Sequence, residues 1–163
     1  MPPAPASYPS AVRYRAALVA DGWKLLATGG RGGTVYRKAG ESFAIKVSEA
    51  DDCYLAYVKF AASYASSHVP QLSLQYDYNG WAVVHTEELF PLEAADIAML
   101  KKWLLDFRAA KMGKMPFPSP ICLSQLLDQI VSIAPQGCGL DVEKTGNVMK
   151  RHNGTLVVTD PLG

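Results

Sequence analysis

Short apolar runs separated by turn residues dominate the first half of the chain, and each run is about as long as a β-strand. The runs cover residues 23–27, 34–37, 42–47, 72–78 and 81–86. Asn79-Gly80, between the last two runs, is typical of a two-residue hairpin turn. This alternation of runs and turns predicts five strands that pair mainly as antiparallel neighbours.

Helical periodicity appears in four other stretches, where apolar residues recur every three or four positions. We expect helices over residues 11–21, 53–66 and 94–111, and a fourth that ends near Ala134. Asp51 and Asp52 precede the second helix, as expected for residues that cap a helix and complement its dipole. A hairpin with its turn at His152–Gly154 is expected to close the chain, and the proline-rich residues 1–9 to form an extended or disordered tail.

These elements predict an α+β fold in three parts. The parts are residues 1–21, with the tail and first helix; residues 22–86, with five strands around one main helix; and residues 87–163, mostly helical and ending in the hairpin. The 163 residues suit one domain or two small lobes.

The overall composition narrows the possible partners and location. Sixteen Lys and Arg balance fifteen Asp and Glu, so no basic surplus favours nucleic acid as a partner. No apolar run approaches about 18 residues, so no membrane span is expected. The three cysteines form no Cys-x-x-Cys pair, and their number and scatter favour a reducing cytosol over a disulfide framework.

Two features of the first half suggest phosphate binding. Thr28–Gly33 holds four glycines, whose backbone N–H groups can approach phosphate oxygens without a side-chain clash. Lys46 follows at a distance that could bring its ammonium group beneath this loop. The alternatives are that the loop is a mobile turn and that the lysine extends into solvent.

The last 25 residues contain three oxygen donors, Asp141, Asn147 and Asp160. A closing hairpin would bring Asn147 and Asp160 together. Hard oxygen ligands in such a pair suit Mg²⁺ and phosphate chemistry.

In this order the motifs resemble those of the protein kinase fold. The matching segments are Thr28–Val35 for the glycine loop, Ala44-Ile-Lys46 for the lysine strand, Thr86–Leu89 for the hinge, Asp141–Asn147 for the catalytic loop, and Asp160-Pro-Leu-Gly163 for the metal-binding Asp-Phe-Gly. The Gly-Asn-Val-Met segment and the Thr-Asp-Pro after the last strand are most similar to the small serine/threonine kinases of lytic tailed phages.

The resemblance implies a kinase-like α+β fold with a five-stranded antiparallel N-lobe and a truncated, mostly helical C-lobe. It implies ATP as the cofactor, held by Gly30, Gly32, Gly33, Val35 and Lys46, with the hinge residues Glu87 and Leu89 at the adenine. It further implies Mg²⁺ on Asn147 and Asp160, with Asp141 as catalytic base assisted by Lys46. The partner would be a bacterial host protein, as substrate or target, in the host cytoplasm.

Several residues depart from the kinase pattern. Thr28 replaces the first glycine, and Asn147 follows Asp141 by six positions where the family has five. Glu143 stands where the family has histidine, which makes it a second candidate base.

The expected acidic helix partner of Lys46 is also missing: no acid lies between Asp52 and Asp77, which leaves Asp52 or Glu49 as substitutes. From the sequence we also expect no substrate-binding platform of the kinase type after Gly163. Three hypotheses follow: a kinase with weak or lost activity, a pseudokinase that inhibits a host or defence protein by binding it, and a plain α+β domain whose glycines and acids form only turns and caps.

Overall fold

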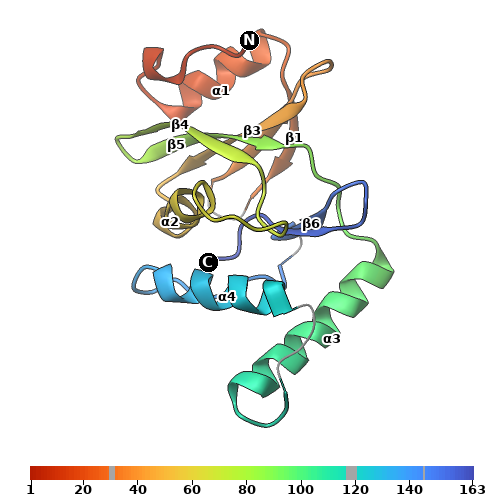
Figure 1. Cartoon of the computed structure of the whole chain (residues 1–163). Helices are drawn as coiled ribbons and strands as arrows, with labels where there is room; N and C mark the ends of the chain where they lie inside the picture. The colour runs from red at the N-terminus through yellow and green to blue at the C-terminus, as the bar shows by residue number, and fades with distance from the viewer. Residues whose placement is uncertain (30–31, 117–120, 145) are drawn as a thin grey trace. The chain divides into compact units, whose positions relative to one another are not determined.

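The computed structural model describes residues 1–29, 32–116, 121–144 and 146–163 (Figure 1). The chain divides into two compact units. Unit 1 comprises Met1–Ser63 and Gln71–Glu88, and unit 2 comprises Tyr64–Pro70 and Leu89–Gly163. No helix among the described residues is both long enough and apolar enough to cross a membrane.

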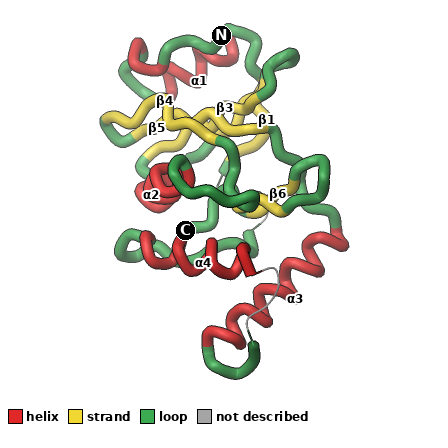
Figure 2. Tube along the Cα trace, in the orientation of Figure 1, coloured by secondary structure: helices red, strands yellow, loops and turns green. Residues whose placement is uncertain are grey.

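Unit 1 is built on a five-stranded sheet in the order β1-β2-β3-β5-β4, in which every neighbouring pair is antiparallel. The strands are β1 (Lys24–Thr28), β2 (Thr34–Arg37), β3 (Phe43–Glu49), β4 (Leu72–Tyr78) and β5 (Trp81–Glu87). Two helices, α1 (Ala11–Ala20) and α2 (Asp52–Ala61), lie on opposite faces of this sheet (Figures 1 and 2). The predicted α+β class and the five antiparallel strands are confirmed.

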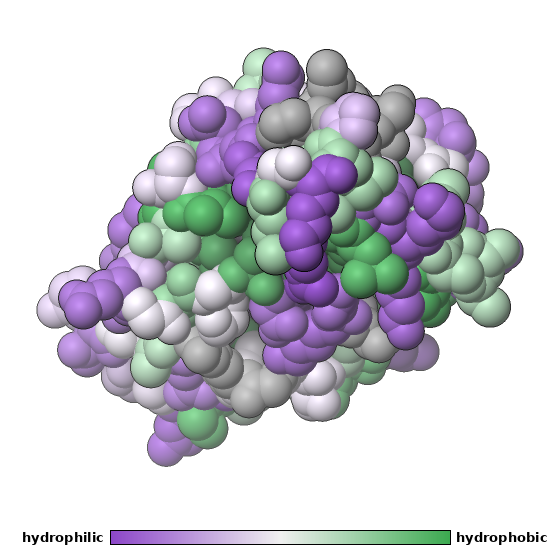
Figure 3. All heavy atoms as spheres, turned by 90° about the horizontal axis from the view of Figure 1, so that it is seen from below, coloured by the Kyte–Doolittle hydropathy of each residue, from purple (hydrophilic) through white to green (hydrophobic). Residues whose placement is uncertain are grey.

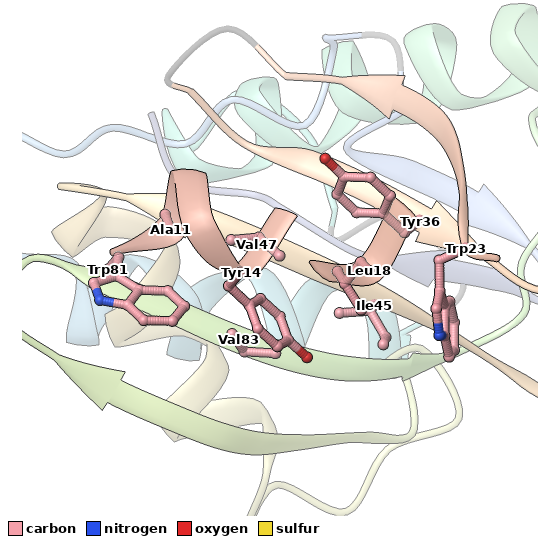
Figure 4. Packing of buried hydrophobic residues seen from close by; sticks show 9 residues of the cluster. All are labelled: Ala11, Tyr14, Leu18, Trp23, Tyr36, Ile45, Val47, Trp81 and Val83. Atoms are coloured by element: carbon pink, nitrogen blue, oxygen red, sulfur yellow. The ribbon is translucent and has the colours of Figure 1, made fainter. Parts of the chain in front are cut away.

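The main core of unit 1 lies between α1 and the sheet. Tyr14 and Leu18 point from the helix toward Ile45, Val47 and Val83 (Figure 4). Each large side chain buried in this way stabilises the fold by about 1.5–3 kcal/mol. Helix α1 is therefore an integral part of unit 1.

The proline-rich N-terminus is more ordered than its composition suggests. Pro5–Ser7 form a short 3₁₀-helix, η1, and the Tyr8 ring packs edge-on against Tyr14 with 5.6 Å between ring centroids. The expectation of an extended or disordered tail is wrong for these residues, because Tyr8 gains apolar contact by packing against the core.

Helix α2 begins as predicted but ends early. The Asp51 carboxylate accepts a hydrogen bond of 3.0 Å from the Tyr54 N–H and caps the helix. The helix stops at Ala61 instead of continuing to Ser66. The following segment, Tyr64–Pro70, belongs to unit 2, where the His68 ring Nδ1 lies 2.8 Å from the Leu156 carbonyl and the His68 carbonyl accepts from the Val158 N–H.

Unit 2 contains α3 (Ala94–Lys111), α4 (Ile121–Ile133) and the hairpin of β6 (Val148–Lys150) and β7 (Leu156–Val158). Lys150 connects the hairpin to the start of α3 through ion pairs with Asp96 at 2.7 Å and Glu93 at 3.2 Å. The Lys150 and Phe90 backbones also exchange two hydrogen bonds. The hairpin is thereby fixed to the entry of α3.

The state of the cysteines differs from the expectation. Cys53 and Cys138 are each disulfide-bonded. The scatter of cysteines along the sequence fails to exclude a disulfide because sequence separation does not measure distance in the fold. The prediction that the cysteines form no disulfide is therefore wrong for Cys53 and Cys138, and these two residues give no support to a reducing compartment.

His85 gives unit 1 a pH-dependent element. Its ring stacks on Phe43, with 4.7 Å between centroids, and its Nε2 is buried without a hydrogen-bond partner among the described residues. Burial lowers the pKa of His85 because the imidazolium form would lose its hydration.

The folded state therefore resists protonation of His85, and stability should fall as the pH drops below the unfolded-state pKa of about 6.5 toward the lower folded-state pKa. A His85→Phe variant keeps a stacked ring but does not titrate, so we expect its free energy of unfolding to fall less on acidification. Urea unfolding of both proteins at about pH 7.5 and about pH 5.5 measures the difference. Equal losses in the two proteins would contradict the assignment.

Candidate functional site

The glycine loop between β1 and β2 is closed on itself and attached to α1. The Gly29 N–H donates a hydrogen bond of 2.6 Å to the Gly33 carbonyl. Gly32 has a φ of +71°, a conformation that strongly favours glycine. From α1, the Arg15 Nη2 donates a hydrogen bond of 2.5 Å to the Gly32 carbonyl. Gly30 lies outside the described residues.

Arg15 also fixes the two strands beside the loop. Its Nε donates to Thr34 Oγ1 at 2.9 Å, and its Nη1 pairs with Glu49 Oε2 at 2.5 Å. One guanidinium thus connects the loop with β2 and β3. The sequence analysis missed this role of Arg15, because nothing in the local sequence relates a helical arginine to a loop 17 residues away.

Lys46 lies on β3 between Val35 of β2 and Val84 of β5. A Cβ built on Gly33 would lie 3.5 Å from Lys46 Cε, so the lysine stem passes beneath the glycine loop. The Lys46 Nζ lies 3.4 Å from the centroid of the Tyr54 ring on α2. Such a cation–π contact stabilises the charged ammonium form by about 0.5–2 kcal/mol.

Helix α2 therefore contributes an aromatic ring to the surroundings of Lys46. The two acidic substitutes are positioned differently. Glu49 pairs with Arg15, and Asp52 lies in the first turn of α2, beside its cap. A search for acidic partners along the sequence misses Tyr54 because a π-face can also bind a cation.

The predicted hinge residues fall at the boundary of the two units, which the chain crosses between Glu88 and Leu89. Glu87 ends β5, and its carboxylate accepts a hydrogen bond of 2.8 Å from the Gln71 N–H. Glu88 pairs with Arg37 at 2.6 Å. Leu89 is half-buried and begins this part of unit 2.

In unit 2, the Asn147 side chain is bonded to the backbone of Asp141. Its Nδ2 donates a hydrogen bond of 2.6 Å to the Asp141 carbonyl, and Asn147 itself is buried. The loop turns just before the asparagine: the Asn147 N–H donates to the Lys144 carbonyl at 3.0 Å, and Gly146 has a φ of +91°. This left-handed conformation favours glycine.

Asp160 is held next to Asn147 through the backbone. The Asn147 carbonyl accepts from the Thr159 N–H at 2.8 Å and from the Asp160 N–H at 3.4 Å. Thr159 Oγ1 also donates to the Gly146 carbonyl at 2.6 Å. The hairpin thus places Asn147 and Asp160 together, and Oδ1 of the Asp160 carboxylate is shielded from solvent.

A short ladder that the sequence analysis did not anticipate positions Asp141. Residues 139–141 run antiparallel to residues 161–163, with Gly139 and Gly163 exchanging hydrogen bonds of 2.8 and 3.0 Å. The Asp141 N–H donates to the Pro161 carbonyl at 2.6 Å. A Cβ on Gly163 would lie only 3.0 Å from Asp141 Oδ2, so the carboxylate rests against the bare glycine backbone.

Glu143, the second candidate base, points to a different partner. Its carboxylate pairs with Arg108 of α3 at 2.8 Å. Both side chains are largely exposed, so this pair contributes little to stability. Asp141 is the acid of this loop that shares contacts with both Asn147 and the chain around Asp160.

The donor set of unit 2 suits a hard cation. Asn147 Nδ2 is engaged by a carbonyl, which leaves Oδ1 as the oxygen ligand, and Asp160 adds a carboxylate. No cluster of three or more His, Cys, Asp or Glu side chains within the described ranges could hold a metal ion. Mg²⁺ fits this sparse set because it usually takes one or two carboxylates and completes its shell with water and phosphate oxygens.

A comparison with models of known protein families finds no match for this chain. A comparison with curated protein sequences finds no match either.

Loss of the Arg15 guanidinium should loosen the glycine loop. In an Arg15→Gln variant we expect faster amide hydrogen exchange at Gly32, Gly33 and Thr34, because the loop loses its connection to α1. The matched control is Arg13→Gln, an exposed position two residues earlier on the same helix. Unchanged exchange in Arg15→Gln would contradict the role given to this residue.

Removal of the Asn147 amide should destabilise the loop that carries Asp141. Asn147→Ala leaves the Asp141 carbonyl without its 2.6 Å donor, and we expect a loss of about 1–3 kcal/mol in the free energy of unfolding. Asn153→Ala removes an exposed turn hydrogen bond to the Thr155 N–H and should cost less than about 1 kcal/mol. Chemical denaturation of the three proteins provides the comparison, and equal costs for the two variants would argue against a buried, structural Asn147.

Proposed function

We propose that this chain is a protein-kinase-like module, similar to the small serine/threonine kinases of lytic tailed phages, whose phosphoryl transfer is weak or lost. The observation that carries the proposal is the arrangement in unit 2, where Asn147 is bonded to Asp141 by its side chain and to the Thr159–Asp160 segment by its carbonyl. Asn147, itself a candidate metal ligand, is thereby bonded to the candidate base and to the segment of the second candidate ligand.

In this proposal, each residue of unit 2 has a separate role. Asn147 Oδ1 and Asp160 would hold Mg²⁺, which when bound supplies positive charge that neutralises phosphate oxygens. Asp141 would orient a substrate hydroxyl and accept its proton. The ladder between residues 139–141 and 161–163 would keep the Asp141 carboxylate in place, so little reorganisation is needed.

Unit 1 would bind the nucleotide. Backbone N–H groups of the glycine loop and the Lys46 ammonium would contact phosphate oxygens, and Arg15 would keep the loop in its closed form. Val35 would pack against the base, and the backbone between Glu87 and Leu89 would hydrogen-bond its edge. A bacterial host protein is the proposed substrate, in the host cytoplasm.

The Tyr54 ring favours a second candidate, a pseudokinase that inhibits a host or defence protein by direct binding. Helix α2 carries no acid after Asp52, and its Tyr54 ring lies 3.4 Å from the Lys46 ammonium. This departure from the kinase pattern motivates a protein that keeps nucleotide binding and loses the transfer step. This second candidate retains the fold and loses the turnover.

Calorimetric titration with ATP, with and without Mg²⁺, tests the nucleotide site. We expect Lys46→Met to weaken binding about tenfold because one charge-assisted contact is lost. Asp160→Asn should reduce the difference between the ATP affinities measured with and without Mg²⁺. Lys38→Met, which removes an exposed ion pair with Asp21 in unit 1, serves as the control and should leave affinity unchanged.

Transfer of radiolabelled γ-phosphate then separates the two candidates. Slow transfer of labelled phosphate to protein, if it disappears in both Asp141→Asn and Asp160→Asn, would support the kinase. Mg-ATP binding without any transfer would support the pseudokinase. No binding at millimolar Mg-ATP by the folded protein would refute the kinase, and clear Mg-ATP binding with phosphate transfer to a substrate would refute the pseudokinase.

A further inference from the structure

Unit 2 contains a pocket of about 160 Å³ between α3, the loop after Asp141 and strand β6. Its walls are mainly apolar and include Leu92, Ile97, Leu104, Val142, Val148 and Met149. An apolar cavity of about 150 Å³ is large enough to bind benzene. The pocket, here called the α3 pocket, therefore has room for one apolar side chain.

The charges around the α3 pocket are unbalanced. Lys101 and Lys144 line it, both are exposed, and neither has an ion-pair partner within the described part of the chain. Glu143 also lines it, but its carboxylate is paired with Arg108 at 2.8 Å. By contrast, the neighbouring Lys102 pairs with Asp106 along the helix. Among the residues that the structure describes, the α3 pocket thus has two lysines at its edge without ion-pair partners.

Exposed apolar residues beside long hydrophilic ones are a general feature of the face drawn in Figure 3, where green patches are bordered by purple side chains. Ile97 contributes to the α3 pocket while 36% exposed. An apolar side chain that enters the pocket would cover this surface, and acidic neighbours on the same peptide would meet Lys101 and Lys144.

We propose that the α3 pocket binds an acidic peptide segment of a partner protein through one apolar side chain, with acidic residues on either side of it. The pocket begins directly after Asp141, at Val142, and reaches Gly146, directly before Asn147. The bound segment is therefore held beside the loop that carries the candidate base. The docking itself requires no nucleotide, so it stands or fails independently of the proposed phosphoryl transfer.

Fluorescence anisotropy with a labelled synthetic peptide, Gly-Asp-Glu-Leu-Glu-Asp-Gly, tests the docking without ATP or Mg²⁺. We expect saturable binding that weakens with added salt, because both cations are exposed. Two comparison peptides carry either Ser in place of Leu or Lys in place of each acid. Each should bind at least about tenfold more weakly, since one loses the apolar group and the other the charge complementarity.

Protein variants locate the site. A Lys101→Glu and Lys144→Glu double variant should bind the acidic peptide about tenfold more weakly. Lys114→Glu is the matched control, because Lys114 is exposed and does not line the pocket. Methyl NMR of the wild-type protein should show shifts at Ile97 and Met149 on peptide addition, and none at the exposed Val131 of α4.

Three results would overturn the proposal, provided that each variant shows a wild-type unfolding transition. These are equal binding of the acidic and lysine peptides, equal affinity of the double variant and the Lys114→Glu control, and methyl shifts confined to residues outside the pocket. Loss of phosphoryl transfer with retained peptide binding would count against the proposed kinase activity alone.

Discussion

The Asn147 carboxamide is the contact on which the candidate chemistry of unit 2 depends. Its Nδ2 donates to the Asp141 carbonyl, while the backbone carbonyl of the same residue accepts from Thr159 and Asp160. A buried carbonyl without a donor costs more free energy than an ordinary hydrogen bond contributes. These hydrogen bonds therefore fix the Asp141 loop, the hairpin and the final segment in one conformation. The amide is oriented so that its oxygen is available as a metal ligand.

In unit 1, the Arg15 guanidinium likewise joins separate segments of the chain. Arg15 reaches from α1 to the glycine loop, β2 and β3 with three donors of a single planar group. The helix that carries Arg15 is fixed by the burial of Tyr14 and Leu18 against the sheet. Packing on one face of the sheet thus controls a loop at its edge, and the glycines need not be mobile.

Lys46 is where the kinase resemblance and the local chemistry differ most. The stem passes beneath Gly33 as the resemblance leads one to expect, but the ammonium lies over the Tyr54 ring. An aromatic face stabilises positive charge without fixing its direction. Helix α2 carries no acid after Asp52, and this departure from the kinase pattern is the reason to place binding ahead of turnover. It also makes a docking surface such as the α3 pocket relevant whether or not phosphate is transferred.

The sequence by itself determined the elements of this protein. Apolar periodicity and the glycine and proline punctuation predicted the five strands and the helices, because these signals act over a few neighbouring residues. The Asp51 cap and the Asn79-Gly80 turn were predictable for the same reason. The order of Asp141, Asn147 and Asp160 likewise suggested an oxygen-rich site once a closing hairpin was inferred.

Only the tertiary structure decided which groups meet. The contacts of Arg15 with the glycine loop, of Tyr54 with Lys46 and of residues 139–141 with 161–163 join positions that the sequence pattern does not relate. The early end of α2 and the order of the N-terminal residues around Tyr8 are also decided by long-range contacts, at His68 and at Tyr14. Such contacts depend on how the elements pack, and local propensity carries no information about that packing.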